Sequence, residues 1–187
     1  MHVLNIPGLN NSGAGHWQTH WEQAFPQQFK RVQQKNWSAP AKNDWVGELR
    51  TTIESYDSPV VLVAHSLGCI TVAHWANENK SPAIAGALLV APADAEQSKR
   101  ACFQTFCPVP KIKLPFPSIV VASTNDPYAV MENSAKLAAW WGSKFVCVGD
   151  KGHINAASGL DLWKEGLSLL SKVSGNLAIT LQDSIHV

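Results

Sequence analysis

Short continuous apolar runs alternate along the chain with segments in which apolar residues recur every three or four positions. The continuous runs are typical of strands that are buried on both faces of a parallel sheet. Such strands are predicted at residues 2–6, 59–64, 83–91, 118–123 and 144–148. A more polar run at 30–34 predicts a further strand.

The segments with a period of three or four residues are typical of helices that bury one face. Helices are predicted at residues 14–25, 42–56, 67–79, 133–141 and 159–173. In the second of these, Trp45, Leu49 and Ile53 form the buried stripe, and Asn43 or Asp44 is the expected N-cap. Strands that alternate with helices predict an α/β protein, a three-layer α/β/α sandwich with a mainly parallel central sheet.

The chain has 187 residues, of which 45% are hydrophobic and 16% are charged, so we expect one globular domain over residues 1–187. Residues 93–116 form an irregular, proline-rich insertion. Because loops of this length are often functional, we expect the insertion to lie near a site. After Gly175, alternating apolar residues predict either a short edge strand or a packed terminus.

Composition excludes several classes of protein. The net charge is +1 and no run of Lys or Arg occurs, which argues against nucleic acid as a partner. No signal-peptide pattern and no apolar stretch of membrane-spanning length is found, so no membrane span is expected. The four cysteines are too few and too scattered for a disulfide framework, although Cys102 and Cys107 are near enough to pair. Reduced thiols in the cytoplasm are the preferred interpretation.

His16 and His20 have the spacing of two zinc ligands on a helix. However, Trp17 occupies the place of the glutamate in H-E-x-x-H, and no third ligand is evident. We therefore expect no metal and no cofactor.

Chemically competent residues follow several of the predicted strands. Ser66 follows the run at 59–64, Asp126 follows the run at 118–123, and His153 follows the run at 144–148. Sites in doubly wound sheets form at the carboxyl ends of strands, and the order Ser, Asp, His is that of α/β-hydrolases. A serine hydroxyl needs a neighbouring imidazole to remove its proton, and an acid to orient that imidazole.

The nucleophile and the acid of this triad each have an alternative. Ser66 would also suit a simple helix N-cap, and the elbow motif G-x-S-x-G has Ala64 at its first glycine. Alanine is small enough for this position, so the prediction of a nucleophile stands. Asp94 competes with Asp126 for the role of the acid, whereas Asp150 lies too close in sequence to the histidine.

The surroundings of the nucleophile follow from the same topology. The backbone N–H of Leu67, directly after the serine, is the first expected oxyanion donor, and the N–H of Leu9 is the second. His65 is expected to support the turn. The predicted pocket residues are Asn10, His65, Phe103, Phe106 and Phe116.

Several segments resemble the retinoblastoma-binding protein 9 family of small serine hydrolases, including its bacterial members. The segments are P-G-L at 7–9, N-W-x-x-P at 36–40, D-W at 44–45, V-A-H-S-L-G-C at 63–69, S-T-N-D-P-Y at 123–128 and G-H-I-N-A-x-S-G at 152–159. The resemblance implies a minimal α/β-hydrolase fold without a large cap domain, and a Ser66–Asp126–His153 triad. The pocket-protein-binding motif L-x-C-x-E is not matched, because Thr71 stands in place of its glutamate.

We therefore expect a serine hydrolase that cleaves a small-molecule ester, thioester or amide through an acyl-enzyme. Two alternatives remain open at this stage. One is a non-catalytic protein-binding module that retains the hydrolase fold. The other is an acyltransferase that uses the same triad with an acceptor other than water.

Overall fold

A computed structural model describes residues 1–79 and 83–175 of the chain. Within these residues a sheet of six strands has the order β2-β1-β3-β4-β5-β6, and every neighbouring pair is parallel. The strands are β1 (Val3–Ile6), β2 (Phe29–Arg31), β3 (Val60–His65), β4 (Ile84–Val90), β5 (Ser118–Ala122) and β6 (Lys144–Cys147). The prediction of an α/β fold with a mainly parallel sheet is confirmed.

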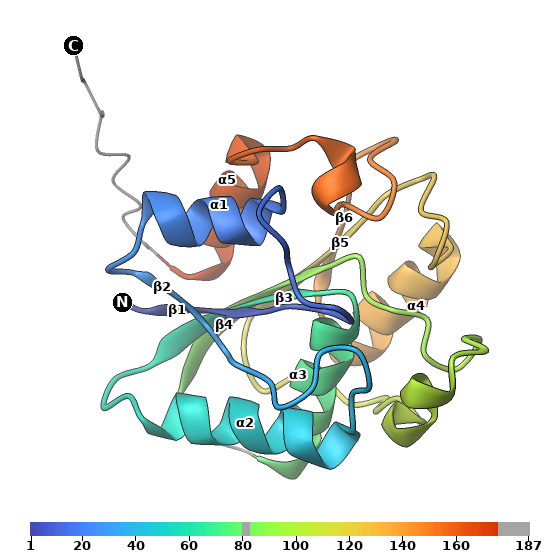
Figure 1. Ribbon diagram of the computed structural model, residues 1–187, viewed down its shortest axis with the longest axis horizontal. Helices are drawn as coiled ribbons and strands as arrows, with labels where there is room; N and C mark the ends of the chain where they lie inside the picture. The colour runs from blue at the N-terminus through green and yellow to red at the C-terminus, as the bar shows by residue number, and fades with distance from the viewer. Residues whose placement is uncertain (80–82, 176–187) are drawn as a thin grey trace.

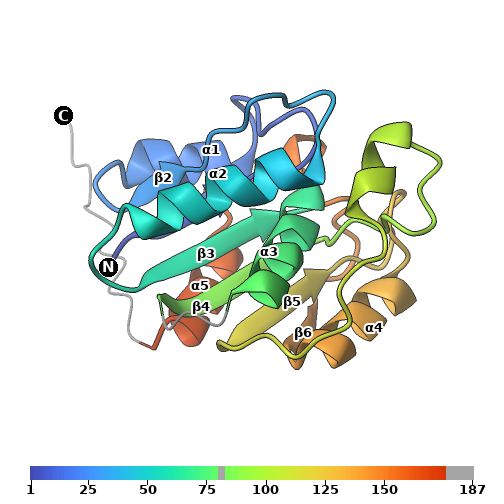
Figure 2. The same cartoon turned by 90° about the horizontal axis from the view of Figure 1, so that it is seen from below.

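Helices cover both faces of this sheet (Figure 1). The helices are α1 (Trp17–Ala24), α2 (Lys42–Glu54), α3 (Leu67–Glu78), α4 (Met131–Trp141) and α5 (Lys164–Val173), with short 3-10 turns η1 (Ala101–Phe106) and η2 (Ala156–Ser158). One core cluster joins α1 and α5 to the sheet, and a second joins α2, α3 and α4 to the opposite face. In Figure 2, α2 and α3 lie in front of the sheet and α5 lies behind it.

The central strands are apolar because helices cover them on both sides. Every residue of β3 is buried, and so is nearly all of β4. The last strand differs from the prediction, since β6 pairs only with β5 and is largely exposed. Its apolar run identifies a strand correctly, but an apolar run alone does not distinguish an edge strand from a central one.

Element ends differ from the sequence predictions at three places. The second strand begins at Phe29 and ends at Arg31, earlier than expected. Helix α2 begins after Ala41, and the hydroxyl of Thr105 in η1 accepts the N–H of Lys42 in place of the predicted caps. Helix α5 begins only at Lys164, because positive φ angles interrupt the chain between residues 159 and 163. The alternating residues predicted after Gly175 lie outside the described residues.

No helix in the described parts of the chain is both long enough and apolar enough to cross a membrane.

Candidate active site

Ser66 lies on a strained turn between β3 and α3. Its φ of 54° and ψ of −119° fall in a region that residues with a side chain rarely adopt. The turn is held to the sheet, because the Ser66 N–H donates to the carbonyl of Val90 at the end of β4, at 2.9 Å. The Ser66 side chain makes no capping hydrogen bond to α3. The hydroxyl is therefore turned away from the helix that it precedes, unlike that of an N-cap serine.

Two glycines allow the chain to approach this turn closely. A Cβ on Gly68 would lie 2.2 Å from the carbonyl oxygen of Ile6 in β1. A Cβ on Gly8 would lie 2.8 Å from Cβ of Ser66. Ala64, by contrast, is an ordinary buried residue of β3 that pairs with Ile6. The close approach at the elbow thus depends on Gly68 and Gly8 and does not need a glycine at position 64.

A chain of hydrogen bonds connects the three residues predicted as the triad. The Ser66 hydroxyl and Nε2 of His153 are 2.9 Å apart, and Nδ1 of His153 donates to Oδ2 of Asp126 at 2.7 Å. The other oxygen, Oδ1 of Asp126, accepts the backbone N–H groups of Tyr128 at 2.9 Å and Ala129 at 3.3 Å. The Asp126 side chain is only 3% exposed, so its carboxylate is held in one orientation.

The competing acids are engaged elsewhere. Asp94 accepts the backbone N–H of Gln97 and the side-chain amide of Asn133. Asp150 accepts the hydroxyl of Thr124. Neither carboxylate bonds to the imidazole of His153, which among these three acids pairs with Asp126.

Two further histidines surround this imidazole and are kept neutral by burial. Nε2 of His65 donates to the backbone carbonyl of His153 at 2.9 Å, and burial lowers the pKa of His65. His16 is 4% exposed, and its Nδ1 accepts the N–H of Gln18. Burial, followed by the positive charge of Arg31, lowers the pKa of His16 to about 3. Of the three clustered histidines, the structure pairs only His153 with a carboxylate.

The two predicted oxyanion donors lie on either side of Ser66. Leu67 is the first residue of α3, where the amide has no partner within the helix and the helix dipole is positive. Leu9 lies in the loop after β1 and lines the same cavity as Ser66. Within residues 1–79 and 83–175, neither amide donates a hydrogen bond to the protein. Both N–H groups are therefore free to bind an oxyanion.

The loop that follows Leu9 is held by an arginine that the sequence analysis missed. The guanidinium of Arg31, at the end of β2, donates to Oδ1 of Asn11 at 2.9 Å and to the carbonyl of Ser12 at 2.8 Å. It also donates twice to Glu22 and once to Thr19 on α1. All five N–H groups of Arg31 are thereby used, and the loop is tied to both β2 and α1.

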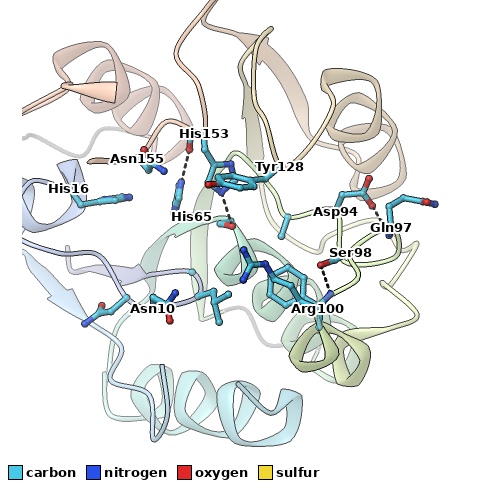
Figure 3. A pocket seen from close by; sticks show the side chains of 16 residues that line it. Asn10, His16, His65, Asp94, Gln97, Ser98, Arg100, Tyr128, His153 and Asn155 are labelled. Carbon is cyan, nitrogen blue, oxygen red and sulfur yellow. Dashed lines mark hydrogen bonds between the residues drawn. The ribbon is translucent and has the colours of Figure 1, made fainter. Parts of the chain in front are cut away.

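A cavity of about 350 Å³ opens over Ser66 (Figure 3). Of the predicted pocket residues, Asn10, His65 and Phe103 line it. Phe106 and Phe116 do not, and this part of the prediction is wrong. Both belong to the hydrophobic core on the α2–α3–α4 face of the sheet. Their positions in the insertion suggested a pocket wall, but an apolar side chain in a long loop can equally turn into the core.

Other lining residues had not been predicted as part of the site. Tyr128 is 62% exposed, and its ring packs edge-on against His153, with ring centroids 4.9 Å apart. His16, Asn155 and Arg100 also line the cavity. The sequence held a signal for two of them, since Tyr128 and Asn155 lie within the two segments that carry Asp126 and His153, at 123–128 and 152–159. Residues 93–103 of the insertion contribute Asp94, Gln97, Ser98, Arg100 and Phe103 to the lining.

Within the two described ranges, no group of three or more His, Cys, Asp or Glu side chains is arranged to hold a metal ion. All four cysteines are free thiols, Cys102 and Cys107 included.

The parallel sheet, with a serine on a tight turn after β3, defines an α/β hydrolase. The family comparison agrees: residues 3–172 match the serine hydrolase family model, and the chain belongs to this family. A protein of Pectobacterium atrosepticum described as a YdeN-like hydrolase is 33% identical, over 93% of this chain and 90% of its own, with a TM-score of 0.84. The comparison with curated proteins found no match.

More distant structures share the fold alone. The ydeN gene product of B. subtilis is 20% identical over 94% of this chain and 99% of its own, with a TM-score of 0.72. A thermophilic esterase of Thermogutta terrifontis is 13% identical over 93% of this chain and 90% of its own, with a TM-score of 0.67.

Proposed function

We propose that this serine hydrolase cleaves small esters, thioesters or amides through an acyl-enzyme on Ser66. The observation that supports the proposal best is the hydrogen-bond chain from Ser66 through His153 to Asp126, which lies under an open cavity. The proposal also assigns the chain to the retinoblastoma-binding protein 9 family within the serine hydrolases. The support for this finer assignment is the segment G-H-I-N-A-x-S-G at 152–159.

In the proposed acylation step, Oγ of Ser66 attacks the carbonyl carbon while its proton passes to Nε2 of His153. Asp126 stabilises the imidazolium that forms. The carbonyl oxygen becomes an oxyanion and binds the N–H groups of Leu9 and Leu67. One such donor contributes about a hundredfold or more to kcat in comparable enzymes. The bond to the leaving group then breaks, and His153 returns the proton to the departing oxygen, sulfur or nitrogen.

Deacylation repeats these steps with water as the nucleophile. Water attacks the acyl carbon and gives one proton to His153. The bond from that carbon to Oγ of Ser66 breaks, and the imidazolium reprotonates the serine. The acid leaves, and the enzyme returns to its starting state.

Covalent labelling with a fluorophosphonate probe tests the nucleophile. We expect the wild-type protein to be labelled and Ser66→Ala to be unlabelled while it remains folded by circular dichroism. Ser98→Ala is the matched control, because it removes a different hydroxyl from the same cavity and leaves the triad intact. Labelling that survives in Ser66→Ala would show that another residue is the nucleophile.

The two alternatives give different results in the same set of experiments. A non-catalytic binding module would stay folded, would not react with the probe and would leave 4-nitrophenyl acetate intact. An acyltransferase would react with the probe, but in the presence of added alcohols or amines it would form mainly the transfer product. A hydrolase releases the free acid both with and without added alcohols or amines. Mass spectrometry of the products distinguishes the free acid from the transfer product.

A further inference from the structure

We propose that the substrate of this cavity carries a carboxylate and that Arg100 binds it. The inference rests on the proposed function, because it names the class of ester that the Ser66 site accepts. Three features of the cavity carry it: the position of Arg100, the absence of a partner for its charge among the described residues, and the engagement of the nearby carboxylates by other groups.

Arg100 directly precedes η1 and lines the cavity. Figure 3 shows its side chain extending from the backbone beside Ser98 toward the middle of the cavity, on the side of Asn10 and Tyr128. The hydrogen bonds of Arg100 are made by its backbone: its N–H donates to the hydroxyl of Ser98, and its carbonyl accepts the N–H of Phe103. In the part of the chain that the structure describes, its guanidinium has no ion pair and no hydrogen bond.

The acidic groups of the site do not offer a partner for this cation. Asp94 also lines the cavity, but both of its carboxylate oxygens accept hydrogen bonds, from Gln97 and from Asn133. The carboxylate of Asp126 is buried against His153 and two backbone amides. Among the described residues of the lining, Arg100 is thus the cation that has no partner and remains available to an anionic ligand.

The rest of the lining adds no competing positive charge and few negative ones. His16 and His65 are uncharged because burial lowers the pKa of each imidazole. The amino end of α3, which points its free amides at the site, favours negative charge in the same space. An anionic group of a substrate that reaches the Arg100 side of the cavity therefore meets an unpaired cation there.

The chemistry of the guanidinium selects the class of anion. Its planar fork of N–H donors matches the two oxygens of a carboxylate, and charge-assisted bonds of this kind are stronger than neutral ones. A cavity of about 350 Å³ lies at the small end of the range for ligand sites. The geometry therefore favours a short ester or thioester with one carboxylate, placed on either the acyl group or the leaving alcohol.

Two pairs of substrates test the inference and separate these placements. The acyl pair is 4-nitrophenyl hydrogen adipate and its neutral isostere, 4-nitrophenyl 6-methylheptanoate. The alcohol pair is 4-acetoxybenzoate and its methyl ester. For the anionic member of at least one pair, we expect Arg100→Gln to lower kcat/KM by about tenfold, the lower end for a charge-assisted bidentate contact. For the neutral members, we expect a change of less than about twofold.

Two further variants sharpen the result. Lys99→Gln removes the neighbouring exposed cation, which does not line the cavity, and should leave the anionic preference unchanged. Arg100→Lys keeps the charge without the fork and should give an intermediate value. The preference should also weaken as salt is added, because Arg100 is exposed.

The outcomes distinguish failure of this inference from failure of the proposed function. If the fluorophosphonate labels Ser66 and the neutral esters are hydrolysed, but Arg100→Gln changes neither pair, only the role of Arg100 is wrong. An equal loss in Lys99→Gln would also overturn it, because the effect would then come from the general surface charge. If the wild type is neither labelled nor active on any ester, the proposed function itself fails.

Discussion

Replacing His16 with asparagine is expected to reduce the pH dependence of folding stability. His16 is 4% exposed and is the N-cap of α1, where its Nδ1 accepts the N–H of Gln18 at 3.2 Å. Its Nε2 is buried without a hydrogen-bond partner among the described residues. Asparagine is also a favoured N-cap, so His16→Asn keeps the start of the helix while it removes the titratable group.

The magnitude follows from the difference in pKa between the two states of the chain. The pKa of His16 is about 3 in the folded protein, against 6.5 in the unfolded chain. Between these values the unfolded chain binds the proton more strongly, so stability is complete above pH 6.5 and falls as the pH falls toward 3. At pH 5 the unfolded imidazole is protonated about thirtyfold over neutral, which corresponds to a loss of about 2 kcal/mol.

Urea unfolding followed by far-UV circular dichroism at pH 8 and pH 5 measures this loss. We expect the decrease in the free energy of unfolding between the two pH values to be about 2 kcal/mol smaller in His16→Asn than in the wild type. The pKa of His65 is lowered as well, so a residual decrease should remain. His2→Asn, which removes an exposed histidine, is the control and should behave like the wild type. Equal decreases in His16→Asn and the wild type would refute a buried, neutral His16.

Two further substitutions test the elbow and the loop beside it. Gly68→Ala places a Cβ against the carbonyl of Ile6, and we expect the free energy of unfolding to fall by roughly 2–3 kcal/mol in urea titrations. The control Gly47→Ala adds a Cβ in open space on α2 and should instead raise the free energy of unfolding by about 1 kcal/mol. A similar loss of stability in both variants would contradict the steric argument. The lysine in Arg31→Lys cannot reproduce five hydrogen bonds, so the loop after Leu9 should lose its position. We then expect kcat on 4-nitrophenyl acetate to fall about tenfold with little change in KM. A lower melting temperature with unchanged kcat would show that Arg31 is only structural.

The sequence was sufficient for those features that depend on burial along the chain. Continuous apolar runs occur in β3, β4 and β5 because helices cover both faces, and the polar residues of these strands stand only at their ends. Ser66, Asp126 and His153 could be proposed together because parallel strands bring their carboxyl ends to one edge. Their positions after three different strands therefore predicted proximity before any distance was known.

Features that depend on how loops turn in space could not be predicted in the same way. Phe103 and Phe106 are three residues apart in one 3-10 turn and both pack in the core, yet only Phe103 also lines the cavity. The sequence presents Arg31 only as part of a polar strand, because nothing in its sequence neighbourhood indicates five hydrogen bonds to the loop at Asn11 and Ser12 and to helix α1. Arg100 was missed for the same reason, since the direction of an exposed side chain is decided by the fold of the insertion.

The neutral histidines connect the stability of this site with the proposed chemistry. When His153 takes the proton of Ser66, an imidazolium forms with its ring centroid 4.9 Å from that of His65. A positive charge on His65 would oppose that imidazolium by about 3 kcal/mol at an effective dielectric constant of about 20. Burial prevents this by keeping His65 and His16 uncharged, and the same burial makes folding less favourable at acidic pH. Acid sensitivity of the fold is thus the consequence of burying His65 and His16 as uncharged groups beside the proposed catalytic histidine.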